Sequence, residues 1–364
     1  MGRLFQCGSA YASLCGGAAL LIASAAWAAA PAVPIPADLP EAAYHVEVSP
    51  QNIAATPATV ESGTVNVEGQ ARKADGHPCT LWDKQDIAEI KARLETDPAA
   101  KKALDDLKAK ADARIAKELN VPIAQKGSDG KPIYPGDFAA DVPPFKKVSA
   151  TNESNAKDIA LLGTAYALTG DEKYGEFARR MIVAYADNYG GYGHPAKWTY
   201  RSAIDGRLTG QFLEDGFWLQ AVAFGTDLIH DLPSFTQAQR DHVRDDLFRP
   251  IVAEFAAMAD EKRDYFSALH NRAATAAAAS LTAGYAVDDE QTVTTALYGV
   301  NGSAQNPTGG LIGTHFSEKC IYPDGLWNEG APAYQIGIAT SALMNAAETL
   351  WHHDIDLYRH ATAR

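Results

Sequence analysis

Long apolar runs and clusters of positive charge are both missing from this chain of 364 residues. Beyond residue 28, no stretch reaches the ~18 apolar residues that a membrane-spanning helix needs. Acidic residues outnumber basic ones by 45 to 32, which gives a formal net charge of −13. Broad nucleic-acid binding is therefore disfavoured. A polyanionic sugar stays open as a ligand, because a local basic pocket can exist on an acidic surface.

Several common catalytic motifs are absent as well. The sequence contains no Gly-x-Ser-x-Gly, no phosphate-binding loop and no His-Glu-x-x-His. A serine hydrolase, a nucleotide-dependent enzyme and a zincin are all disfavoured for that reason. With 46% hydrophobic and 21% charged residues, the chain has the composition of an ordinary globular protein with enough apolar material for a core.

Cysteine is scarce, and two of the four cysteines lie in a segment typical of a secretion signal. Arg3 supplies a positive start, residues 18–26 form an apolar stretch, and Ala26-Trp27-Ala28 fits the small-x-small rule for signal peptidase. We expect residues 1–28 to be a signal peptide and the mature protein to be periplasmic or secreted.

Two cysteines then remain, Cys79 and Cys320. Two thiols are too few for a four-ligand zinc site. In an oxidising compartment they form either one disulfide or two buried thiols. Our prediction is a Cys79–Cys320 bridge, which would close a loop of about 240 residues and stabilise the fold by ~3–5 kcal/mol in the loop-entropy model.

The rest of the chain divides into an extended lead-in, residues 29–79, and a helical domain, residues 80–364. Thr80 to Asp83 resembles a helix-capping box, and Asp97-Pro98 is typical of a second helix start. A loop rich in Gly, Pro and Asp is expected over residues 126–147. Further helices are predicted over residues 156–168, 173–185, 208–229, 236–257, 271–285, 292–298 and 332–351. Because alternating patterns are nearly absent, we expect an all-α fold, with helical hairpins arranged around an axis as an (α/α) toroid.

The most informative motif runs from Asp324 to Tyr334, with the sequence DGLWNEGAPAY. Asp324-Gly325 indicates a turn, and Tyr334 falls in the first turn of the following helix, where the helix dipole favours a phenolate. Trp327 can stack on a sugar ring, while Asn328 and Glu329 can bind hydroxyl groups. The alternative is a loop that is simply packed by its aromatic residues.

A second motif, Leu269-His270-Asn271-Arg272, precedes the alanine-rich helix. The amide and the guanidinium can neutralise a carboxylate, and His270 can exchange a proton near pH 7. The alternative is structural, with Asn271 as the N-cap of the helix and His270 beside it.

Aromatic and basic residues also alternate around Tyr200 and Arg201, followed by Gln211 and the pair Glu214-Asp215. These side chains suit either a cleft for a charged sugar or a solvated loop. His352-His353-Asp354 looks like a metal site, but adjacent helical residues point about 100° apart, so we expect these residues at the surface.

Together these motifs resemble the alginate lyase and heparinase II/III-like polysaccharide lyases. The resemblance also covers Ala165-Tyr166-Ala167-Leu168-Thr169-Gly170-Asp171 and Gly210-Gln211-Phe212-Leu213-Glu214-Asp215, and the Asp324–Tyr334 motif is its most specific part. It implies a metal-independent polysaccharide lyase that needs no cofactor and acts on an anionic, 4-linked uronate polysaccharide such as alginate.

The resemblance also implies residue roles. Tyr334 would serve as the acid and base, His270 and Asn271 would act at the carboxylate, and Arg272 would bind substrate with Tyr200, Arg201, Gln211, Trp327, Asn328 and Glu329. Two features depart from the family pattern. Many relatives read Asn-His where this chain reads His270-Asn271, and heparinase-like members continue into a β-sheet domain that supplies another histidine. The chain is therefore either a helical single-domain lyase or a piece of a longer one.

Two other functions stay open at this point. An (α/α)-toroid glycoside hydrolase would use two carboxylates, such as Asp215 and Glu329. A non-catalytic exported glycan-binding protein would bind saccharide without turnover.

Overall fold

The computed structural model describes residues 71–133, 144–193, 206–257, 265–322, 327–329 and 334–358. Helices dominate these residues, as the sequence predicts. They are α3 (Lys84–Thr96), α4 (Pro98–Ile115), α5 (Pro144–Thr169), α6 (Glu172–Tyr189), α7 (Phe212–Leu228), α8 (Gln237–Val243), α9 (Arg249–Ala257), α10 (Asn271–Ala286), α11 (Glu290–Tyr298) and α13 (Ser341–Trp351). Short π-helical segments cover Arg244–Phe248, Leu311–His315 and Gln335–Thr340, and a 3-10 turn covers Tyr265–Ser267. Strands β1 (Gln125–Lys126) and β2 (Pro132–Ile133) form an antiparallel hairpin.

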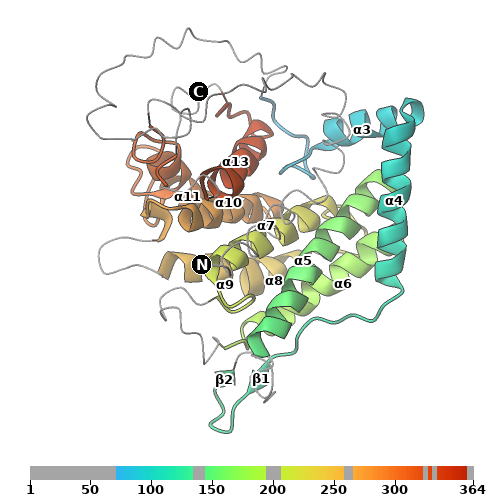
Figure 1. Cartoon of the computed structure of the whole chain (residues 1–364), viewed down its shortest axis with the longest axis horizontal. Coiled ribbons are helices and arrows are strands. Elements are labelled where there is room, and N and C mark those ends of the chain that lie inside the picture. The colour runs from blue at the N-terminus through green and yellow to red at the C-terminus, as the bar shows by residue number, and fades with distance from the viewer. Residues whose placement is uncertain are drawn as a thin grey trace, which may run out of the picture.

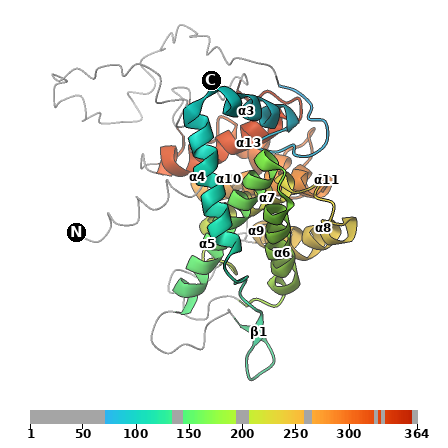
Figure 2. The same ribbon diagram turned by 90° about the vertical axis from the view of Figure 1, so that its right-hand side faces the viewer.

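The helices form two layers of hairpins, which is the (α/α) toroid architecture expected from the sequence. Helices α5, α7, α10 and α13 pack side by side in that order (Figure 1). Helix α6 packs against α5 and α11 packs against α10, while α4 lies across α5 and α6 (Figure 2). Because an antiparallel partner separates successive members of the first layer, these members run in the same direction. The N-termini of α7, α10 and α13 therefore lie at one end of the layer and their C-termini at the other.

Glycines allow α5, α7 and α10 to approach closely. A Cβ atom on Gly225 of α7 would lie 2.8 Å from the Ile159 carbonyl oxygen of α5, and one on Gly216 would lie 2.9 Å from Thr275 Cγ2 of α10. No real Cβ tolerates such contacts. The alanine-rich sequence of α10 serves the same purpose, since most of its residues are fully buried. The backbone of α10 is thereby fixed against its neighbours, and this fixes the position of its N-terminus.

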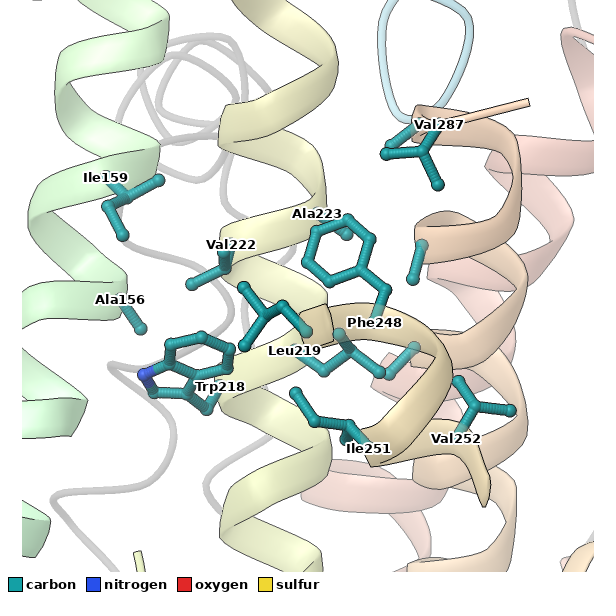
Figure 3. Close-up of a cluster of buried hydrophobic side chains, with 14 of the residues drawn as sticks. Ala156, Ile159, Trp218, Leu219, Val222, Ala223, Phe248, Ile251, Val252 and Val287 are labelled. Atoms are coloured by element: carbon teal, nitrogen blue, oxygen red, sulfur yellow. The ribbon is translucent and has the colours of Figure 1, made fainter. Parts of the chain in front are cut away.

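The core lies between the two layers. Trp218 of α7 points toward Ala156 and Ile159 of α5, while Phe248 and Ile251 of the outer layer pack around the other side of α7 (Figure 3). The indole of Trp218 also meets the Tyr185 ring edge-on, with the ring centroids 4.8 Å apart. Burial of each such side chain contributes about 1.5–3 kcal/mol. In the part of the chain that the structure describes, no helix is both long and apolar enough to cross a bilayer.

The structure corrects the position of one helix cap. The capping box of α3 is Asp83 with Asp86, three residues later than the predicted Thr80 with Asp83. The hydroxyl of Thr80 donates instead to Asp227, 2.6 Å away. The predicted start at Asp97-Pro98 is confirmed, because Asp97 caps α4 and Pro98 is its first residue.

His352 is also not at the surface. It is fully buried, its Nδ1 lies 2.5 Å from the Thr80 carbonyl oxygen, and its Nε2 lies 2.9 Å from Asp86 Oδ2. Periodicity could not reveal this, because the segment that covers His352 lies more than 250 residues earlier in the chain.

The predicted Cys79–Cys320 disulfide is wrong. Both cysteines are free and buried. Cys79 lies beside Tyr285 near the C-terminal end of α10, and its Sγ is 3.9 Å from the Tyr285 carbonyl oxygen. Cys320 packs instead with Ala274 near the N-terminal end. Ala274 and Tyr285 are eleven positions apart along α10, which corresponds to about 16 Å of helix, whereas a disulfide needs Cα atoms within about 7 Å.

The predicted signal peptide, residues 1–28, and most of the predicted lead-in lie outside the described residues. The division into lead-in and helical domain stays a prediction.

Candidate active site

The candidate site begins at the N-terminus of α10. His270 is the N-cap: its backbone is extended and its Nδ1 accepts the Ala273 amide hydrogen at 3.1 Å. The sequence alternative had given this role to Asn271, which is instead the first helical residue and is buried. The pKa of His270 is lowered, by burial and by the neighbouring Arg272. His270 is therefore neutral near pH 7, and because Nδ1 is an acceptor, its proton sits on Nε2.

Glu329 joins the second motif to this helix start. Its Oε2 accepts the Asn271 amide hydrogen at 3.0 Å, although the two residues lie 58 positions apart. Burial raises the pKa of Glu329 above its usual range. The Glu329 carbonyl oxygen also accepts a hydrogen bond from the side chain of Gln335, which opens the π-helical segment before α13. Glu329 thus connects the start of α10 to the start of the last helix.

Tyr334 directly precedes this π-helical segment and has helical backbone angles. Residues 330–333, where the predicted helix would begin, lie outside the described residues, so the position of Tyr334 in the first turn stays a prediction. Its side chain is half exposed, at 51%. The Gln335–Glu329–Asn271 contacts place this turn beside the start of α10. The exposed phenol of Tyr334 and the buried Asn271 therefore belong to the same end of the helical layer.

Asn328 is held by the segment before the motif. Its backbone amide donates to the Cys320 carbonyl oxygen at 2.7 Å, and its side-chain oxygen accepts the Tyr322 hydroxyl hydrogen at 2.6 Å. An isolated bridge between Ile321 and Trp327 adds a further tie. These contacts fix the motif just before it reaches Glu329.

Trp327 does not offer the open face that sugar stacking would need. It is 5% exposed and packs with Ala274, Cys320 and Ala339. Its indole also stacks on His315, with the centroids 5.8 Å apart and 28° between the ring planes. We therefore assign Trp327 to the packing beneath the site rather than to the sugar-binding surface.

His315 belongs to this region although sequence reasoning missed it. It is fully buried in a π-helical segment. Burial, followed by the proximity of His270, lowers its pKa to about 3. A lone histidine in Thr314-His315-Phe316 carries no local signal, and only its neighbourhood with His270 and Trp327 distinguishes it.

The start of α7 presents Gln211 at the same end of the layer. Gln211 is the N-cap by backbone geometry, and its side chain donates to Glu214 Oε1 at 3.2 Å.

Asp215 has a structural role in the same helix. It is buried and accepts hydrogen bonds from the Leu208 amide and from both the amide and the hydroxyl of Thr209. Burial raises the pKa of Asp215 to about 6, and its carboxylate is used to hold the preceding loop.

The carboxylate pair of the hydrolase alternative is therefore not favoured, because the Asp215 carboxylate already accepts hydrogen bonds from Leu208 and Thr209.

The remaining predicted site residues differ in where they lie. Tyr200 and Arg201 lie outside the described residues. Arg272, next to Asn271, is half-buried. The structure thus brings together His270, Asn271, Glu329 and the Tyr334 turn from the predicted set.

A family model and two curated relatives match this chain in sequence. The family model described as alginate lyase matches residues 89–364. An exo-oligoalginate lyase of Saccharophagus degradans is 29% identical over 72% of this chain, and an alginate lyase of Stenotrophomonas maltophilia is 34% identical over 53%. The chain spans only about a third and a quarter of the lengths of these two relatives, at 32% and 25%.

Solved structures of similar fold include a histidine-to-alanine variant of alginate lyase A1-III complexed with tetrasaccharide. It shares 17% identity and a TM-score of 0.52, with 79% of this chain and 74% of that one covered. An alginate lyase from Bacteroides ovatus shares 14% identity and a TM-score of 0.53, with 78% of each chain covered. These similarities support the toroid fold.

Proposed function

Because the chain belongs to the alginate lyase family, we propose that it cleaves a 4-linked uronate polysaccharide, alginate first, by β-elimination at the N-terminal end of α10. The observation that carries the proposal is the arrangement at this helix start, where a neutral His270, Asn271 and Arg272 adjoin the turn that presents Tyr334. The curated relatives that match the chain are themselves named as alginate lyases.

The first requirement of the reaction is to neutralise the uronate carboxylate. The proton on C5 is acidic enough to remove only when the adjacent carboxylate no longer repels the developing negative charge. The side chains of Asn271 and Arg272 supply a dipole and a charge for this purpose, and the positive end of the α10 dipole adds to them. The Nε2–H group of neutral His270 acts as a further donor rather than as a base.

The second requirement is proton transfer. A base removes the C5 proton, the C5–H electron pair forms the C4=C5 double bond, and the C4–O4 bond breaks with its pair on O4. The hydroxyl of Tyr334, which is a half-exposed residue, gives its proton to O4. For the linkage epimer that places the C5 proton on the same side, the Tyr334 oxygen also takes the C5 proton and passes it to O4. Glu329 orients both elements through its contacts with Asn271 and Gln335.

The direct test is an ultraviolet absorbance assay over alginate, hyaluronan, chondroitin, heparan and glucuronan. We expect unsaturated product from alginate. New reducing ends without absorbance would favour the hydrolase, and saccharide binding without turnover would favour the glycan-binding protein. Export to the periplasm or medium is part of the proposal, because a polymeric substrate lies outside the cytoplasm.

Replacing Asn271 by alanine should separate catalysis from stability. We expect kcat/KM to fall by about 10²–10³, as for the loss of one preorganised donor. The melting temperature should fall less than in His270→Ala, because His270 rather than Asn271 caps the helix. The comparison variant His270→Ala should also lose about 1 kcal/mol of stability with the cap. Steady-state kinetics and thermal denaturation of both variants check this, and a larger stability loss in Asn271→Ala than in His270→Ala would contradict it.

A further inference from the structure

A second group of titratable side chains lies at the other end of the helical layer. His230 follows α7, Asp288 follows α10, and His77 comes from the segment before α3. Helix α10 has 16 residues, so about 24 Å of helix separates this group from the candidate active site. No step of the proposed reaction uses these side chains.

Three ligand atoms in this group converge. His77 Nε2 lies 3.4 Å from both carboxylate oxygens of Asp288, and His230 Nε2 lies 3.9 Å from Asp288 Oδ2. All three ligand atoms lie within 4.8 Å of one another. The Asp288 side chain is 77% exposed, so an ion can reach this point from solvent.

The opposite nitrogen of each imidazole is already held by a carboxylate. His77 Nδ1 lies 2.6 Å from Asp227 Oδ1, and His230 Nδ1 lies 3.0 Å from Asp231 Oδ1. A carboxylate at Nδ1 keeps the proton there and leaves the Nε2 lone pair for a ligand, which is the usual outer arrangement around metal-binding histidines. Asp227 is itself fixed, because it accepts hydrogen bonds from the Cys79 and Thr80 backbone amides.

We propose that His77, His230 and Asp288 bind one divalent transition-metal ion of the zinc class. Two imidazole nitrogens and one carboxylate oxygen suit Zn²⁺, with water as the fourth ligand, whereas Ca²⁺ and Mg²⁺ prefer oxygen ligands throughout. The ion would join the segment before α3 to the C-terminal ends of α7 and α10. Its role is therefore to stabilise the closure of this end of the fold.

Ion binding requires one local change. The His77 and His230 rings stack with centroids 3.5 Å apart and 16° between their planes, so their Nε2 lone pairs run side by side instead of meeting. His77 is held by the buried Asp227, whereas the Asp231 partner of His230 is exposed. His230 is consequently the ring that tilts toward the ion.

Two neighbouring groups are less suited. In the first group, His77, Cys79 and Asp227 are all buried, and His77 Nδ1 is hydrogen-bonded to Asp227. Burial strongly raises the pKa of the Cys79 thiol, so no thiolate is available as a ligand. In the group of Asp83, Asp86 and His352, the carboxylates already pair with Arg72 and with His352.

Titration calorimetry of the metal alone tests the proposal. Protein without a polyhistidine tag is treated with chelator and titrated with ZnCl₂, and with MgCl₂ as a comparison. We expect one Zn²⁺ per chain, no Mg²⁺ binding at the same concentrations, and a rise in melting temperature with Zn²⁺. Asp288→Asn is the first variant, because it keeps the size of an exposed side chain and asparagine tolerates the φ of 54° at this position.

Asp288→Asn and His230→Ala should each weaken Zn²⁺ binding at least tenfold and abolish the thermal shift. The matched control is His242→Ala, which replaces a half-buried histidine. The two ring nitrogens of His242 contact Asp187 and Asp246 on opposite sides and cannot converge on one ion. This control should bind Zn²⁺ like the wild type. Three results overturn the proposal: no Zn²⁺ binding by the wild type, unchanged affinity in Asp288→Asn and His230→Ala, or equal loss in His242→Ala.

Discussion

Tyr334→Phe is expected to reduce kcat on alginate by about 10²–10⁴, the contribution of a positioned proton-transfer group. The substitution keeps the ring and removes only the hydroxyl of a half-exposed residue that directly precedes the π-helical segment. The melting temperature and the substrate KM should therefore stay close to those of the wild type. Formation of unsaturated product and thermal denaturation, measured on the same preparation, check both expectations.

Tyr322→Phe is the matched control for this variant. Tyr322 is a neighbouring exposed tyrosine whose hydroxyl donates to Asn328 at 2.6 Å, so its loss removes one hydrogen bond, worth about 1 kcal/mol. We expect it to lower activity less than tenfold. Near-wild-type activity of Tyr334→Phe, or an equal effect of the two variants, would show that Tyr334 is not the proton-transfer residue.

Asp227→Ala should have the largest effect on stability, with the free energy of unfolding reduced by about 3–5 kcal/mol. The Asp227 side chain is fully buried and accepts hydrogen bonds from His77 Nδ1, the Cys79 amide and both the amide and the hydroxyl of Thr80. Alanine leaves all of these donors buried without an acceptor, and each such group is costly. Denaturant-induced unfolding measures the change.

Asp231→Ala serves as the control, since its carboxylate is four residues away and 62% exposed. A change within about 0.5 kcal/mol is expected for it, as for most surface substitutions. A loss below about 1 kcal/mol for Asp227→Ala would mean that the segment containing His77 is not anchored through this carboxylate.

Local sequence signals located most helices of this protein. The predicted helix over residues 271–285 matches α10, Asn271–Ala286, and the predicted start at Asp97-Pro98 is the observed start of α4. Helix formation and capping depend on contacts within about four residues, so the sequence carries them. Thr80 and Asp83 could each cap the first helix by local sequence. In the structure the Thr80 hydroxyl donates to the distant Asp227, and Asp83 is the N-cap of α3.

The sequence motifs predicted only part of the candidate site. The motifs placed His270, Asn271 and Tyr334 at helix starts, and the parallel arrangement of α7, α10 and α13 explains why such starts gather at one end. They did not reveal that Trp327 is covered by His315, because an exposed and a buried tryptophan look alike in a loop sequence.

The sequence by itself determined the all-α architecture, the family and the residue types at the helix starts, since periodicity and motifs are properties of neighbouring residues. Only the tertiary structure decided that His270 rather than Asn271 caps α10, because Glu329, 58 positions away, takes the Asn271 amide hydrogen. It likewise separated Cys79 from Cys320, since the two pack near opposite ends of α10. Contacts between residues so far apart along the chain follow from helix packing and leave no trace in local pattern.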